Sequence, residues 1–312
     1  MKTTRIMKSL FGAALPLLLF ASTNGAMAQT ARIAFNAPGT GKGQSSSYLQ
    51  IFSMNPGGSG VVQLTSANAN ASAPSWSPGQ QYIAFSQNQT LYVMEAKGEA
   101  NGGRTFAVAP LAGGAGWSPD GTMLVYEGSS GNLYIVPVDV VNGTAGTPAL
   151  FRSGSYSNPS WSPDGTRIAF WGSDNGNLPF SIKVRNVQTG AEISFGVSDP
   201  AAAPGFSNMT PQWSPNGNFI AFAGPVTWTV TTRKSTSTST AEEIFIANAD
   251  GTGITRVTFL QSFTSSPTWS PDGTTIAFRS DVSGTPSVYK MVLGSNAATL
   301  LRSLAIGPDW NP

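Results

Sequence analysis

Short runs in which apolar and polar residues alternate recur along the chain, and residues that favour turns follow each run. The clearest unit surrounds Trp161, where residues 160–162 form a short first strand and a Pro-Asp-Gly turn leads into a second strand over residues 167–171. A third strand over 182–187 and a fourth over 192–195 complete the unit. No segment has the apolar period and the length expected of a helix, so the pattern predicts short strands throughout.

Five complete copies of this unit follow one another, and each contains a tryptophan before a Ser-Pro pair. The spacings between successive tryptophans are 41, 44, 52 and 56 residues. A repeat of about 40 to 45 residues with four strands in each unit is typical of the blades of a β-propeller. The two longer spacings predict insertions in the loops.

The two ends of the chain each hold part of a sixth unit. Residues 306–312 form a first strand, and residues 31–35 form a second strand that is followed by strands over 48–54 and 61–65. We therefore expect an all-β, six-bladed β-propeller with four-stranded blades, closed by pairing of the C-terminal strand with the N-terminal strands. The alternative is an open array with frayed ends.

The first 28 residues have the pattern of a secretory signal peptide. Three basic residues precede an apolar run over 10–21, and a small-x-small cleavage site ends at Ala28. The run is shorter than the roughly 20 residues that a membrane helix needs. We expect cleavage near Ala28 and a propeller of residues 29–312 in the periplasm or outside the cell, not inserted in a membrane. The alternative is an uncleaved anchor.

The amino-acid composition excludes several kinds of catalytic mechanism, cross-link and metal site. The chain has no histidine and no cysteine, which excludes Ser-His-Asp and Cys-His mechanisms, disulfides and most zinc or iron sites. Without the three basic residues of the signal peptide, 14 basic and 15 acidic residues remain, and no stretch concentrates Lys and Arg beyond residues 233–234. We therefore expect no binding of nucleic acid and no cofactor.

The Trp-Ser-Pro-Asp-Gly turn followed by Ile-Ala-Phe, as in residues 161–170, resembles the repeats of the TolB-type (WD-like) β-propellers. The segment Ile-Phe-Ile-Ala-Asn-Ala-Asp-Gly-Thr-Gly over 244–253 is similar to them as well, and the resemblance covers nearly all of residues 30–312. The resemblance implies a periplasmic, protein-binding propeller. TolB itself carries an additional α/β domain before its propeller, whereas here the propeller begins close to the expected cleavage site. We therefore expect a TolB-like protein and not TolB itself.

Residues that recur from unit to unit are expected to build the blades. The carboxylates of Asp120, Asp164 and Asp272 precede glycine and are typical of tight turns. The six tryptophans occupy equivalent positions, so we expect them to pack between neighbouring blades as core residues. These residues are Trp76, Trp117, Trp161, Trp213, Trp269 and Trp310.

Variable segments are better candidates for a binding site, because function is often carried by loops on a rigid scaffold. The turns between strands one and two and between strands three and four are short and share one face, here called the turn face. The remaining connections share the opposite face, here called the loop face, and include residues 36–47, 172–178, 199–209, 224–240 and 260–266. Residues 227–231 in the longest insertion are expected to extend the strands as a protruding hairpin. Tryptophan and arginine are favoured interface anchors, and the candidate contact residues are Trp228, Arg233, Lys234, Phe206, Met209 and Phe263.

These patterns favour an exported, noncatalytic propeller that acts as a protein–protein interaction scaffold of the periplasm or cell envelope, expected to be a monomer. An alternative is a carbohydrate-binding or glycan-active propeller that uses two carboxylates of the axial channel, although the sequence does not identify such a pair. A third possibility is a structural component of a surface assembly.

Overall fold

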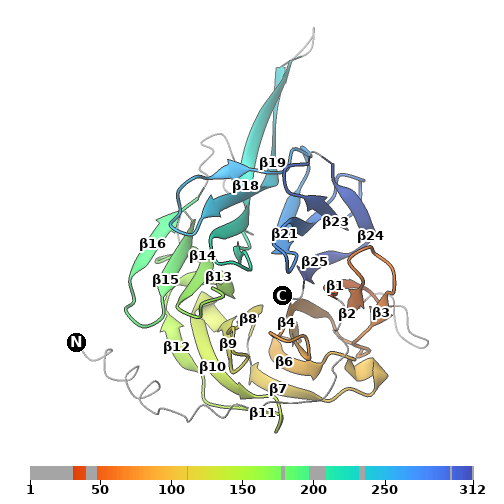
Figure 1. The fold of residues 1–312 in the computed structure, drawn as a ribbon, viewed down its shortest axis with the longest axis vertical. Coiled ribbons are helices and arrows are strands. Elements are labelled where there is room, and N and C mark those ends of the chain that lie inside the picture. Colours follow the sequence, from red (N-terminus) through yellow and green to blue (C-terminus); the bar gives the residue numbers. More distant parts are fainter. Residues whose placement is uncertain are drawn as a thin grey trace.

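A computed structural model describes residues 31–39, 48–110, 112–176, 180–196, 209–231, 236–295 and 297–310. Its six antiparallel sheets surround a central axis, as Figure 1 shows, and this confirms the expected all-β, six-bladed propeller. The only helices among the described residues are two single 3-10 turns, Glu99–Asn101 and Ser129–Gly131. Neither these turns nor any other described segment forms a helix with the length and apolar character needed to cross a membrane.

In the second to sixth blades, the strands follow one another outward from the axis in sequence order. The third blade differs from the expectation of four strands, because both of its last two strands pair with its third strand. The strands of these blades are β4 (Ala71–Trp76), β5 (Tyr82–Gln87), β6 (Thr90–Glu95) and β7 (Thr105–Pro110); β8 (Ala115–Trp117), β9 (Met123–Glu127), β10 (Leu133–Asp139), β11 (Thr144–Ala145) and β12 (Ala149–Arg152); β13 (Ser155–Trp161), β14 (Arg167–Ser173), β15 (Ser181–Asn186) and β16 (Glu192–Phe195); β17 (Gln212–Trp213), β18 (Phe219–Thr231), β19 (Thr236–Asn248) and β20 (Thr255–Arg256); and β21 (Thr264–Trp269), β22 (Thr275–Ser280), β23 (Ser287–Val292) and β24 (Thr299–Ser303).

The first blade combines the two ends of the described chain. Its C-terminal strand pairs antiparallel with its first N-terminal strand, so that Trp310 lies opposite Ile33 and Asp309 lies opposite Ala34. This pairing confirms the expected closure of the ring. The strands of this blade, from the axis outward, are β25 (Ile306–Trp310), β1 (Ile33–Pro38), β2 (Leu49–Met54) and β3 (Val62–Gln63).

Both faces of each blade are buried, and the Ile-Ala-Phe segment shows why. In β14, Ile168 and Phe170 pack with residues of the third blade, whereas Ala169 packs with Trp213 and Ile220 of the fifth blade. Successive side chains of a strand point to opposite faces, so this short apolar run supplies the contacts to both neighbours. All three of these β14 side chains are fully buried, which accounts for the repetition of the segment around the ring.

The recurring tryptophans are partly or fully buried, and the recurring aspartates accept hydrogen bonds within their own turns. Five of the six tryptophans are at most 7% exposed. Trp161 is half-buried and packs against the cluster between the third and fourth blades that contains Ile168 and Phe170. In the turn before β22, Asp272 Oδ1 accepts hydrogen bonds from Ser270 Oγ (2.6 Å), Thr274 N (2.9 Å) and Thr274 Oγ1 (2.8 Å). These bonds, led by the one from Ser270, hold the pKa of Asp272 below its ordinary value.

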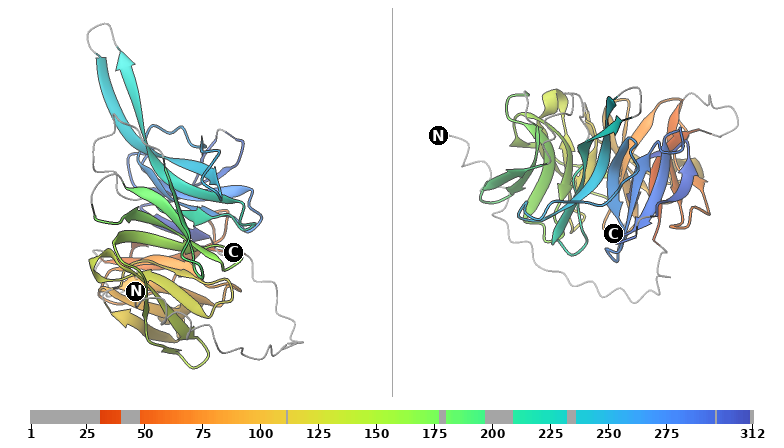
Figure 2. Two further views of the ribbon diagram at one scale, coloured as in Figure 1. Left: turned by 90° about the vertical axis from the view of Figure 1, so that its left-hand side faces the viewer. Right: turned by 90° about the horizontal axis from the view of Figure 1, so that it is seen from above.

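The fifth blade carries the longest hairpin of the described chain. Strands β18 and β19 pair without interruption from Phe219 opposite Asn248 to Thr231 opposite Thr236. Figures 1 and 2 show that the distal part of this hairpin leaves the ring as an extended ribbon. The protruding hairpin expected from residues 227–231 is therefore confirmed.

Candidate functional site

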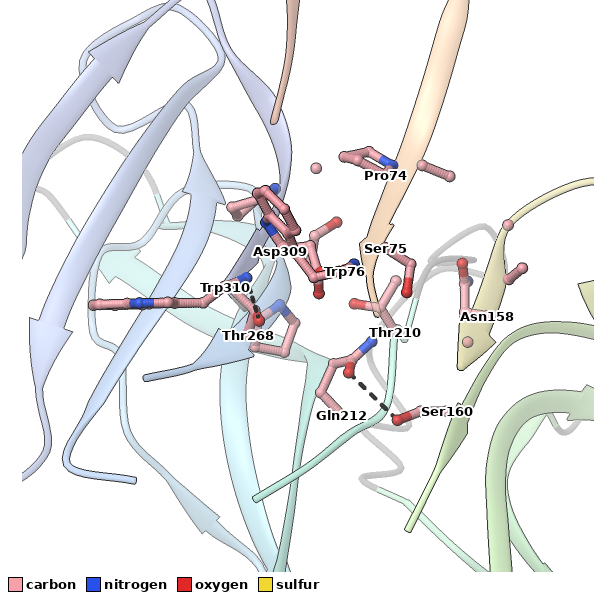
Figure 3. A pocket seen from close by; sticks show the side chains of 18 of the residues that line it. Pro74, Ser75, Trp76, Asn158, Ser160, Thr210, Gln212, Thr268, Asp309 and Trp310 are labelled. Carbon is pink, nitrogen blue, oxygen red and sulfur yellow. Dashed lines mark hydrogen bonds between the residues drawn. The ribbon is translucent and has the colours of Figure 1, made fainter. Parts of the chain in front are cut away.

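The innermost strands of the six blades enclose an axial cavity of about 600 Å³, part of which Figure 3 shows from close by. Two positions of the repeat supply much of its wall. The residues immediately before the recurring tryptophans are Ser75, Gly116, Ser160, Gln212, Thr268 and Asp309. The residues three positions before the tryptophans are Ala73, Gly114, Asn158, Thr210, Ser266 and Gly307.

A repeated bulge shapes this wall. In four blades, the residue three positions before the tryptophan has a φ between 51° and 57° and precedes a proline. The pairing of the innermost strand is shifted at the bulge, for example between Ser157 and Ser160 in β13. Proline cannot donate to a sheet ladder and therefore suits a bulge on the innermost strand, whose free edge faces the cavity. Sequence reasoning missed this feature, although the repeated X-Pro-X-Trp pattern was its signal.

Hydrogen bonds along the wall connect neighbouring blades. The Trp117 Nε1 donates to the Ser75 carbonyl oxygen at 3.0 Å, and Trp269 Nε1 donates to the Gln212 carbonyl oxygen at 3.1 Å. Farther along the wall, Ser160 Oγ donates to Gln212 Oε1 at 3.3 Å (Figure 3). Several polar groups of the wall therefore hold the innermost strands together.

Asp309 is the only carboxylate among the described residues that line the cavity. Its burial raises the pKa of the carboxyl to about 7, although the hydrogen bond from the Trp76 backbone N–H opposes this shift. Two carboxylates are needed for the usual hydrolysis of a glycosidic bond. The described wall supplies only one carboxylate. In the described parts of the chain, no group of three or more Asp, Glu, His or Cys side chains is arranged to hold a metal ion.

The structure brings two of the candidate contact residues, Trp228 and Met209, to one cluster, and Phe263 lies outside that cluster. Trp228 is half-buried and packs against a cluster between the fourth and fifth blades, and Met209 is a buried member of that cluster. Phe263 is also half-buried, and the guanidinium of Arg279, which lines the cavity, lies 4.5 Å from the centre of its ring. The remaining candidates, Phe206, Arg233 and Lys234, lie outside the described residues.

At the base of the hairpin lies a buried carboxyl group that sequence reasoning missed. Glu242 in β19 is 1% exposed, and neither of its carboxyl oxygens has a hydrogen-bond partner in the described part of the chain. Burial raises the pKa of Glu242 to about 7, while nearby Arg279 lowers it and nearby Asp281 raises it. Two adjacent glutamates within a strand pattern were the available signal, because successive side chains cannot share one exposed face.

The neighbouring Glu243 is equally buried but fully bonded. Its Oε1 lies 3.1 Å from Arg256 Nη2 and accepts a hydrogen bond from the Gln261 N–H at 2.7 Å. Its Oε2 accepts a hydrogen bond from the Thr258 hydroxyl. Glu243 therefore anchors the connection between the fifth and sixth blades, whereas Glu242 is a buried acid without a hydrogen-bond partner in the described part of the chain.

An ionic cluster joins the third and fourth blades. Glu192 lies 3.2 Å from Arg152, 3.3 Å from Lys183 and 3.5 Å from Arg185. Asp174 lies 2.6 Å from Arg152 and also accepts a hydrogen bond from the Tyr156 hydroxyl. The partners come from different strands, and the sequence gives no indication that they meet. Lys183 is only 8% exposed, whereas the Asp174 side chain is 60% exposed, so the cluster extends from the packed interior between the two blades to the surface.

Comparison with known proteins identifies relatives of this fold. A family model described as the TolB beta propeller domain matches residues 40–227 and 206–307, which together cover most of the chain. The structure of TolB from Acinetobacter baumannii superposes with a TM-score of 0.66 at 17% identity, covering 98% of this chain and 70% of that one. A candidate TolB from Agrobacterium tumefaciens gives a TM-score of 0.60 at 19% identity, covering 89% and 90% of the two chains. A chain of the Nidogen/Laminin complex gives 0.64 at 9% identity, covering 90% and 98%.

Proposed function

This chain belongs to the TolB β-propeller family, and from that premise we propose that it is a noncatalytic scaffold that binds a protein partner in the cell envelope. One contrast in the molecule carries the proposal. The residues that recur around the ring are used for packing and turns, whereas the connections of the loop face differ in length and sequence from blade to blade. A rigid frame with variable loops on one face is the usual arrangement of a binding protein.

The proposed contact surface is the part of the loop face formed by the fifth and sixth blades. The longest described hairpin belongs to the fifth blade, and Phe263 precedes the first strand of the sixth. Aromatic and arginine side chains supply much of the binding energy at protein interfaces. The proposed contact residues are Trp228, Arg233, Lys234, Phe206 and Phe263.

A capture experiment from envelope extract tests this surface. Immobilised wild-type protein is compared with the double variant Trp228→Ala, Arg233→Ala and with the single variant Phe263→Ala. The matched control is Arg104→Ala, Val141→Ala, because Val141 is 73% exposed and the Arg104 side chain is 61% exposed in turns of the turn face. Loss of a specific partner from the loop-face variants, but not from the control, supports the proposal. Equal recovery of every captured protein by the wild type and all three variants would show that this surface does not bind the partner.

We also propose that the chain is exported and that residues 1–28 are removed. The basic, apolar and small-residue segments at the N-terminus support this proposal. Cell fractionation followed by mass spectrometry of the intact protein tests it, since the exported form should begin at Gln29 and be recovered with the periplasm or the medium. Recovery of a chain that retains residues 1–28 in the membrane fraction would favour an uncleaved anchor.

A further inference from the structure

Strand β19 forms one outer edge of the projecting hairpin. The bonds made at the base of β19 show which of its peptide groups point outward, away from β18. At Ile244 in β19, the backbone N–H donates to Thr258 Oγ1 and the carbonyl oxygen accepts from Val257 N–H, each at 2.8 Å. These partners lie on the side of β19 away from β18. Peptide groups alternate in direction along a strand, so those of Thr240, Thr238 and Thr236 also face away from β18.

This edge has no pairing strand in the described part of the chain beyond Ile244. Its residues 236–240 are Thr-Ser-Thr-Ser-Thr, without the charges or prolines that commonly protect exposed edges from pairing. The opposite edge, in β18, has Pro225 at the base of its projecting part. The unprotected β19 edge can therefore accept another strand.

The projecting ribbon is also short of stabilising contacts. Val226 and Ala241 are buried at its base, whereas Thr229 and Thr238 farther along are exposed and lie opposite each other. A ribbon of two strands is only marginally stable in water, and additional strands stabilise it. Trp228 lies opposite Ser239 in the ribbon and packs on the cluster between the fourth and fifth blades, so it anchors the ribbon from one face and leaves the hydrogen-bonding edge of β19 unpaired in the described part of the chain.

The same edge of a second copy has the properties that such a strand needs. It is extended, carries no charge that would be desolvated without a partner, and presents peptide groups with the same two-residue period. A twofold axis through Thr238 would place Thr238 opposite its own counterpart and Thr236 opposite Thr240 of the second copy. All outward peptide groups would then pair, forming about six hydrogen bonds. Threonine opposite threonine is a favourable cross-strand pair.

We propose that residues 236–240 of β19 pair antiparallel with the same edge of a second copy and join two propellers through a four-stranded sheet. Figures 1 and 2 show the ribbon extending away from the ring, so the two rings need not approach each other. The proposal does not require the partner-binding function proposed above, although both involve the hairpin of β18 and β19. It differs from the monomer that the sequence led us to expect.

Sedimentation velocity of the purified protein over a range of concentrations up to about 200 µM tests this pairing, since a small interface of about six hydrogen bonds is expected to be weak. Thr238→Pro removes one outward N–H and no bond to β18, so it should raise the dimer dissociation constant at least about tenfold. Thr238→Val keeps the N–H and should dimerise like the wild type. Thr229→Pro makes the same change on the opposite edge and should also leave dimerisation intact.

Two further measurements separate loss of pairing from loss of structure. The thermal midpoint and the far-ultraviolet circular dichroism of each variant are compared with those of the wild type. Thr240→Lys keeps every N–H but adds a charge to each strand, so it should also weaken the dimer without changing the monomer. In the wild type, hydrogen exchange at the Thr238 amide should slow as concentration rises.

Three outcomes would overturn the proposal. The first is a wild-type protein that stays monomeric over the whole range, and the second is a dimer that Thr238→Pro and Thr240→Lys leave unchanged. The third is a dimer that Thr229→Pro disrupts and Thr238→Pro does not, which would assign pairing to the β18 edge.

Discussion

The Oδ2 atom of Asp309 accepts a hydrogen bond from the backbone N–H of Trp76 at 2.7 Å, across 233 positions of sequence. This bond connects β25, the strand that closes the ring, to β4, the innermost strand of the next blade. At the equivalent position of the sixth blade, Thr268 Oγ1 accepts from the Trp310 N–H at 3.0 Å. In these two blades, the residue before the tryptophan lines the cavity and also links its strand to the next blade.

The Asp309 carboxyl should make the protein less stable as pH rises. Its pKa of about 7 in the folded protein exceeds the ordinary value of about 4, so the folded state binds more protons than the unfolded state between these values. The free energy of unfolding should therefore fall through this window, by at most about 1.4 kcal/mol per pH unit for one such group. Asp309→Asn keeps an oxygen acceptor for Trp76 and should be more stable than the wild type at pH 8.

Denaturant unfolding at about pH 5 and about pH 8 measures this effect, because the two values lie below and above the pKa of Asp309. Asp272→Asn is the control, since the pKa of Asp272 is lowered and its stabilising contribution is instead lost at low pH. An Asp309→Asn variant with the same pH dependence as the wild type would show that this carboxyl does not titrate in the expected window.

Replacing Glu242 by Gln should stabilise the protein at pH 8. Its carboxyl is buried without a hydrogen-bond partner among the described residues, and ionising it there is unfavourable. We expect a gain of about 1 to 3 kcal/mol in the free energy of unfolding, and little change at pH 5, where the wild-type carboxyl is protonated. The adjacent Glu243→Gln is a matched control and should lower stability, because Glu243 has a buried ion pair with Arg256. Equal effects of the two substitutions would contradict the distinction between them.

Deletion of residues 306–312 should open the ring. It removes β25, including Trp310, which is 7% exposed, and leaves β1 without its inner neighbour. We expect the thermal midpoint to fall by roughly 10 °C or more, because the loss of a buried tryptophan and a strand ladder amounts to about 5 kcal/mol. Deletion of residues 311–312 alone is the control in differential scanning calorimetry. An unchanged melting curve for the longer deletion would mean that this pairing does not hold the ring closed.

Two tryptophan substitutions should separate packing residues from the proposed contact residues. Trp117 is 7% exposed and bonds the preceding blade through Nε1, so Trp117→Ala should cost about 3 to 5 kcal/mol. Trp228 is half-buried where the hairpin packs on the cluster between the fourth and fifth blades, and Trp228→Ala should cost about 1 to 2 kcal/mol. Chemical denaturation of both variants measures the difference. A smaller loss for Trp117 than for Trp228 would contradict the assignment of the recurring tryptophans to the core.

Much of the blade architecture can be predicted because each unit contains the apolar alternation and the turn residues that define its strands. The fourth strand expected over residues 192–195 coincides with β16, and the third strand expected over 182–187 lies one residue from β15. Alternation in Ile168-Ala169-Phe170 predicts a strand with two buried faces, and Asp-Gly turns end the strands. Bonds between residues near in sequence dominate these features, so a local pattern is sufficient.

Sequence patterns did not predict which polar groups meet. Glu242 and Glu243 are neighbours with opposite environments, because the pleat directs one toward the sixth blade without a partner and the other toward Arg256. The division of the outer strand of the third blade into β11 and β12 was also missed, since β10 accepts either segment through backbone bonds that carry no sequence signal.

By itself, the sequence determined the number of blades, their order and the closure of the ring, because each depends on a repeated pattern of apolar residues and turns. The tertiary structure alone decided the raised pKa of Asp309, the isolation of Glu242 and the exposure of the β19 edge. Each of these depends on what surrounds a group in space, and burial, charge and free hydrogen-bonding capacity are set by neighbours that come from other blades.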